Sequence, residues 1–120
     1  MHSVPPAPTY DRACRWVSET YRRSGVDARV GIKLYSVFEA AGLPGPTMRM
    51  HAVIGGAGAL DEVHLDADQA VVLAADIERL GIAMAAELGA DTLVERIVKE
   101  MTENKSVIIG RAEIGAWARI

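Results

Sequence analysis

The side chains of this sequence that suit acid–base chemistry near neutral pH are its three histidines, and they lie far apart in the chain. We take His51 as the candidate catalytic residue, because it lies in an alternating segment where a general base could face a ligand. His51 shares its side of that segment with Arg49, whereas Met48 and Met50 face the other way. The competing interpretation is the polar outward face of an edge strand, which needs no chemistry.

Other residues suited to metal binding or nucleophilic attack are few. His64, Asp66 and Asp68 alternate ahead of an apolar run and could form a metal cluster, but their spacing fits capping and solvation of a helix better. Cys14 is the single cysteine, so an intramolecular disulfide and a metal site built on several thiolates are both excluded. It falls in a helical stripe and is expected to be a small buried hydrophobe. We expect neither a metal nor a cofactor in this chain.

Aromatic and methionine side chains could line an apolar pocket for a small molecule, since aromatic rings give such a pocket shape and methionines give it adaptability. An ordinary place in the hydrophobic core is the alternative for each of them. The candidate substrate-binding residues are Tyr10, Trp16, Tyr35, Phe38, Met48, Met50, Met84 and Trp117.

The composition is rich in apolar residues for so short a chain: 50% of the 120 residues are hydrophobic, and the mean hydropathy is +0.13. Because small domains bury a smaller fraction of their surface than large ones, we expect a homodimer that hides part of this apolar surface. Residues 1–50 carry seven Lys/Arg against four Asp/Glu, and residues 51–120 carry six against twelve. This asymmetry fits either solvated helix faces of opposite sign or patches that help two chains dock.

The net charge of −3 and the pI of about 5.6 give no basic field for nucleic acid. No apolar run reaches the roughly 18 residues that a membrane span requires. The first residues lack the charged and apolar regions of a signal peptide, so the cytoplasm is the expected location.

The hydrophobic pattern changes period along the chain and thereby outlines the elements. Residues 1–8 are proline-rich and read as an extended N-terminal arm, and residues 9–120 read as a single domain. Thr9 is the expected N-cap of the first helix and Asp27 that of the second. The expected helices are 9–23 with the buried stripe Tyr10, Ala13, Cys14, Val17 and Tyr21, and 28–41 with the stripe Val30, Leu34, Val37, Phe38 and Ala41.

The second half begins with an alternating strand at 47–54, and a further helix starts at Asp66 or Asp68 and runs to 80. A short helical piece follows at 82–88. Thr92 and Glu95 have capping-box spacing at the start of the last helix, whose inward row is Leu93, Ile97 and Met101. Residues 113–120 alternate again.

The order of these segments resembles the C-terminal, substrate-side part of class I S-adenosylmethionine-dependent methyltransferases of the bacterial natural-product type. The resemblance covers nearly the whole chain, from Pro5-Pro6-Ala7-Pro8 onwards. The segments that carry it are 30–35 (VGIKLY), 40–44 (AAGLP), 48–56 (MRMHAVIGG), 78–83 (ERLGIA), 91–96 (DTLVER) and 107–119.

The resemblance implies an α+β fold, mainly helical, with a small antiparallel strand pair (47–54 with 113–120). In the family these strands lie at the edge of a larger sheet, residues 30–42 correspond to its last helix, and the intervening helices belong to a lid over the substrate. The glycine-rich loop and the acidic residue that hold the cofactor lie upstream of anything present here. Gly56-Ala57-Gly58 does not replace that loop, because the third glycine of the motif would fall on Asp61.

The chain is therefore not expected to methylate a substrate by itself. One hypothesis is a methyltransferase-derived domain that binds a hydrophobic small molecule and acts as a non-methylating cyclase or isomerase of secondary metabolism, by holding one reactive conformer. The alternative is a partner or regulatory subunit that completes a S-adenosylmethionine-dependent methyltransferase. A gene remnant without a function of its own is the third reading.

Overall fold

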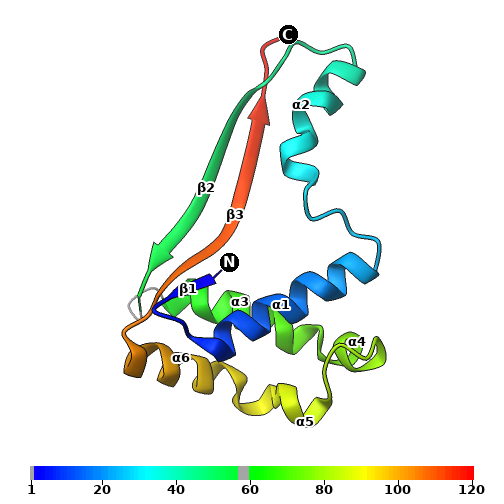
Figure 1. Cartoon of the computed structure of the whole chain (residues 1–120). Helices are drawn as coiled ribbons and strands as arrows, with labels where there is room; N and C mark the ends of the chain where they lie inside the picture. The colour runs from blue at the N-terminus through cyan, green and yellow to red at the C-terminus, as the bar shows by residue number, and fades with distance from the viewer. Residues whose placement is uncertain (1, 57–59) are drawn as a thin grey trace.

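The computed structural model describes residues 2–56 and 60–120, and within these ranges the chain has an elongated shape (Figure 1). The extents are 50 × 33 × 18 Å and the radius of gyration is 16.8 Å, against about 14 Å for a compact domain of this length. One end is a body of helices, and a long pair of antiparallel strands and one helix project from it (Figure 1). None of the described helices is long and apolar enough to cross a bilayer.

The N-terminal segment is tied to the body. His2–Val4 forms strand β1, and helix α1 spans Pro8–Arg23 with a proline in its first turn, where the missing N–H costs nothing. The expected cap Thr9 is wrong, because α1 begins one residue earlier and Thr9 serves a tertiary contact instead. Its N–H donates to Oε1 of Glu100 and its hydroxyl to Oε2, both at 2.8 Å. The predicted stripe is confirmed for Tyr10, Ala13, Cys14 and Val17, and Tyr21 is half-buried.

Replacing Glu100 with glutamine is expected to lower the free energy of unfolding by about 1 to 2 kcal/mol, because one of the two oxygens that accept from Thr9 becomes a donor. Glu103→Gln on the same helix is the matched control, since the ion pair of Glu103 with Lys99 is 4.0 Å long and exposed. Urea unfolding followed by circular dichroism measures both. Equal effects of the two variants would contradict a structural role for the Thr9–Glu100 contact.

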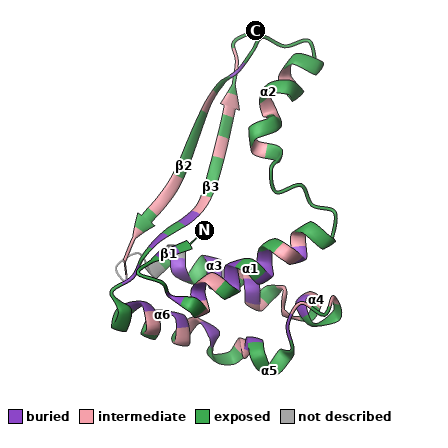
Figure 2. Cartoon of the chain, viewed as in Figure 1, coloured by how far each residue is buried: buried purple, intermediate pink, exposed green. Residues whose placement is uncertain are grey.

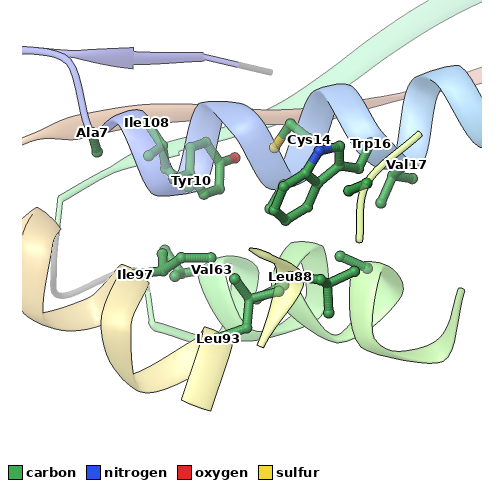
Figure 3. Packing of buried hydrophobic residues seen from close by; sticks show 14 of the residues in the cluster. Ala7, Tyr10, Cys14, Trp16, Val17, Val63, Leu88, Leu93, Ile97 and Ile108 are labelled. Atoms are coloured by element: carbon green, nitrogen blue, oxygen red, sulfur yellow. The ribbon is translucent and has the colours of Figure 1, made fainter. Parts of the chain in front are cut away.

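The body packs α1 against α3 (Leu60–Val72) and α6 (Leu93–Asn104), with the shorter elements α4 (Ala74–Arg79), α5 (Ala85–Leu88) and η1 (Ala90–Thr92) between α3 and α6. The expected inward row of α6 is confirmed. Figure 3 shows side chains from the facing helices and from strand β3 meeting in one cluster. The labelled members are Ala7, Tyr10, Cys14, Trp16, Val17, Val63, Leu88, Leu93, Ile97 and Ile108.

Two predictions about where helices start in the second half of the chain are wrong. Asp66 and Asp68 lie inside α3 and do not cap it, because the buried row of that helix begins before them at Val63 and continues at Ala67 and Ala70. The predicted helix to residue 80 is broken between α3 and α4. Thr92 precedes α6 without a side-chain capping bond, since its hydroxyl faces the carbonyl of Gly89 and accepts from Arg96.

The sheet has three antiparallel strands in the order β1-β3-β2, with β2 at Thr47–Gly55 and β3 at Val107–Trp117. The predicted pairing of the two long strands is confirmed, and the register runs from Thr47↔Trp117 to Gly55↔Ile108 with an irregularity between Ala52 and Ile54. The predicted bounds 113–120 differ from those observed. Strand β3 starts earlier because 107–109 are β-branched and pair with β1.

Helix α2 (Val30–Ala40), strand β2 and residues 110–117 of β3 form the projecting part, which we call the extension. The predicted buried stripe of this helix is wrong: none of its residues is buried, and Leu34 and Phe38 are only half-buried. The reason is that α2 packs mainly against β3, and its residues are exposed or half-buried along its whole length (Figure 2).

Candidate functional site

The predicted pocket residues do not come together in the described structure. Tyr10 and Trp16 are buried in the helical body, whereas Met84 lies exposed just before α5. Tyr35 and Phe38 are on α2, whereas Met48 and Met50 are on β2 and Trp117 is on β3. They belong to a core, a body surface and the extension, so they are not the lining of one site.

His51 is exposed on β2 and lies opposite Glu113 of β3 in the register. Glu113 in turn pairs with Arg111, with Oε1 and Nη2 3.6 Å apart. These three side chains and Arg49 form a polar strip on one face of the β2–β3 strand pair, and Met50 and Ile114 lie on the opposite face. The geometry thus places His51 beside charged groups on an open surface.

The residues considered as metal ligands lie on α3 in different surroundings. Asp66 is buried and accepts a hydrogen bond of 2.8 Å from the hydroxyl of Tyr10, while His64 and Asp68 are exposed. Within residues 2–56 and 60–120 no three His, Cys, Asp or Glu side chains are arranged to hold a metal ion. Of the glycine run after β2, Ala57 and Gly58 lie outside the described residues.

The Tyr10–Asp66 contact is a buried polar pair inside the body, and Cys14 lies beside it. Burial, and then the neighbouring thiol and carboxylate, raise the pKa of Tyr10 far above its ordinary value. Burial also raises the pKa of the Cys14 thiol to about 11. These shifts keep both groups protonated at neutral pH, which fits a structural role and not that of a nucleophile.

Alkylation of Cys14 in the folded chain is expected to rise with pH up to about 11, because only the thiolate reacts. Mass spectrometry after short exposure to iodoacetamide gives this profile, and the chain in concentrated urea is the control, which should level off near the ordinary pKa of about 8.5. A folded-state profile that levels off at the same pH as the unfolded one would contradict the buried environment.

Two open grooves lie beside helix α2: one of about 430 Å³ where the body meets the extension, and one of about 470 Å³ between residues 28–32 and the strands of the extension. Both are lined by Ala28 and Ala112, so they are neighbours. The smaller reaches α1 at Val17 and Tyr21 and includes Gln69 and Arg111. The larger is lined further by residues 29–32, Met50 and Ile114. Sequence reasoning named only Met50 among these lining residues, because the members of the region come from five separate segments.

Helix α2 approaches strand β3 closely at one point. A Cβ atom on Gly31 would lie 2.9 Å from Cδ1 of Ile114, so the absence of a side chain at Gly31 lets the helix backbone meet that isoleucine. Leu34 and Phe38 are half-buried, and the other large apolar side chains of the helix are exposed. We call its exposed apolar part the α2 surface, and its members are Val30, Ile32, Tyr35 and Val37.

No protein-family model, no curated protein and no solved structure matches this chain. The resemblance to methyltransferases therefore stays a prediction.

Proposed function

We propose that this chain is a partner subunit whose extension docks onto a second polypeptide, and that the two together make up a S-adenosylmethionine-dependent methyltransferase. The observation that carries the proposal is the α2 surface. Ile32 and Val37 are 57% and 52% exposed on a helix that has no buried residue. Lys33, Ser36 and Glu39 give the helix one polar side, but apolar side chains outside that side are exposed as well, and large exposed apolar patches on a soluble domain mark interaction sites.

Single exposed apolar side chains also occur in the body, at Val72 and Met84, but the long helices of the body differ from α2. In the body, α1 and α6 each bury one face and show charged residues on the other, as amphipathic helices do. A second chain that covered α2 would bury these apolar side chains, and each Å² of apolar surface removed from water would stabilise the complex by about 25 cal/mol. The extension thus exposes apolar side chains of the kind that a hydrophobic core buries. A second polypeptide is the partner that would bury them.

The class of partner follows from the resemblance. The observed succession of helix, long strand, helical segment and antiparallel strand agrees with the substrate-side part of the methyltransferase family, and the part that would hold the cofactor has no counterpart in this sequence. The partner would supply the glycine-rich loop and the acidic residue that bind S-adenosylmethionine.

Co-expression with methyltransferase-like chains that carry the glycine-rich loop but lack a segment like 30–117 tests the proposal. The expected result is a stoichiometric complex that binds S-adenosylmethionine in calorimetry, while this chain alone does not. Saturable low-micromolar binding of S-adenosylmethionine to this chain alone would overturn the proposed division of labour.

A second candidate function is binding of a hydrophobic small molecule, and the two adjoining grooves favour it. Their volumes fall within the range of ligand pockets, and apolar side chains and one cation, Arg111, line the smaller groove. Anthraquinone-2-carboxylate is a suitable probe. Its binding should be saturable and should be lost in Ala28→Trp, which fills the region that both grooves share; unchanged binding in that variant would place the ligand elsewhere.

A further inference from the structure

Strand β3 has one edge that is only partly used. Its first edge pairs with β2 from Ile108 to Trp117, but its second edge pairs with β1 only at 107–109. Residues 110–117 have no strand on that side within the part of the chain that the structure describes, and we call this segment the free edge. No hydrogen bond among the described residues joins α2 to it, because α2 meets β3 through the Ile114 side chain.

The free edge has the features of a pairing site. It spans about 26 Å at the rise of an extended strand, and it contains no proline. Every second residue directs its N–H and C=O toward the open side, where only water or another strand satisfies them. Long unpaired edges of this kind readily accept a strand from another chain.

We propose that the free edge pairs antiparallel with the same segment of a second copy of this chain, with Ile114 of one copy opposite Ile114 of the other. A two-fold axis perpendicular to the sheet requires that one residue face its own counterpart, because the interface is isologous. The choice of that central residue decides which side chains meet, so the chemistry of the free edge selects the register.

Three central residues can be compared. With Glu113 at the centre, two carboxylates would lie directly opposite each other, which is unfavourable. With Ala112 at the centre, residue 115 would face residue 109, whose outer edge already pairs with His2. With Ile114 at the centre, residues 111–117 pair without reaching β1, two isoleucines meet, and no like charges are opposed.

The Ile114 register also gives the remaining charged groups suitable neighbours. Arg111 of each copy lies opposite Trp117 of the other, on the same face of the joined sheet, where a guanidinium can stack on an indole. Glu113 lies opposite Gly115, and a Cβ at Gly115 would meet no atom within 4 Å. The joined sheet would have the order β2-β3-β3-β2 through the centre.

This dimer uses the edge of β3 and not the α2 surface, so it does not depend on the proposed methyltransferase partner. The two proposals can fail separately, because the dimer is tested with this chain alone. The second copy is preferred over a strand of another protein because, in the Ile114 register, the free edge pairs with itself over residues 111–117 without opposing like charges and without reaching β1.

Engineered cysteines test the register directly, in a chain in which Cys14 is replaced by alanine. Glu113→Cys in one tagged copy and Gly115→Cys in a differently tagged copy should form a disulfide on mild oxidation, since the two residues face each other. Glu113→Cys alone should crosslink poorly, because its two copies would be offset by two residues and lie more than about 7 Å apart at Cα.

Light scattering of the unsubstituted chain, with a monomer mass of 12.9 kDa, provides the second measurement and is independent of the cysteines. The expected result is a dimer that yields the mixed disulfide. A monomer at every concentration, a dimer without the mixed disulfide, or efficient crosslinking of Glu113→Cys alone would each overturn the proposed pairing.

Discussion

Replacing Ile97 with alanine is expected to lower the free energy of unfolding by about 2 to 5 kcal/mol, whereas Ile32→Ala in the isolated chain should cost less than about 1 kcal/mol. The two variants delete the same atoms. Ile97 is fully buried between the helices of the body, and its removal leaves a cavity (Figure 3). Ile32 is 57% exposed on α2, so most of its surface already faces water.

Urea unfolding of both variants at low protein concentration measures the two effects, with the slope of the transition as a check on two-state behaviour. A large difference between the two losses of unfolding free energy would show that the body buries its apolar residues in the isolated chain, whereas α2 does not. Similar losses for Ile97→Ala and Ile32→Ala would mean that α2 is part of the folded core of the isolated chain, against the structure described above.

The second large effect is expected on association. The paired substitution Ile32→Asp with Val37→Asp places two carboxylates on the α2 surface, and it should weaken the complex with a cofactor-binding chain by about 100-fold or more, since buried unpaired charge costs several kcal/mol at an interface. Val72→Asp is the matched control, because Val72 is an exposed apolar residue of α3 in the body.

Surface plasmon resonance with the partner immobilised separates the variants by their dissociation rates. Circular dichroism shows whether the body remains folded, as it should, since no residue of α2 is buried. If the α2 variant binds as well as Val72→Asp, the partner contacts another surface and the proposed docking site is excluded.

Local hydrophobic periodicity was sufficient to predict the buried stripe of each helix that buries a single face. In α1 and α6 the apolar residues recur at helical spacing and the charged residues lie elsewhere, so the stripes at Tyr10, Ala13 and Cys14 and at Ile97 and Met101 were predicted and are confirmed. The antiparallel pairing of β2 with β3 joins segments far apart in the chain, and it followed from the resemblance and not from the pattern of either strand.

Features that depend on a distant partner were not predictable. Asp66 was assigned to a helix cap because its type favours that role, but its surroundings are set by Tyr10, which comes from another helix. The pattern of α2 predicted a buried stripe, yet burial requires a covering element that the described chain does not contain. The early start of β3 depends on pairing with β1, which the sequence did not indicate.

The candidate site was limited by the same problem. Residue type marks Tyr10, Trp16 and Met84 equally as pocket residues, but only the fold shows that the first two are core and the third is exposed. The groove and edge residues that the structure brings forward, such as Ala28, Arg111 and Ala112, carry no chemical signal of their own. Their importance arises from position alone.

Hydrogen exchange of the α2 amides is the most direct measurement of the central claim, that the extension needs a second chain to be complete. In the isolated chain under dilution, the amides of α2 should exchange much faster than those of α1 and α6, because no described element covers the helix on its outer side. In the complex with a cofactor-binding chain, α2 should become as protected as α1. Equal protection of α2 and α1 in the dilute, isolated chain would show that the extension is stable by itself, and would contradict the account.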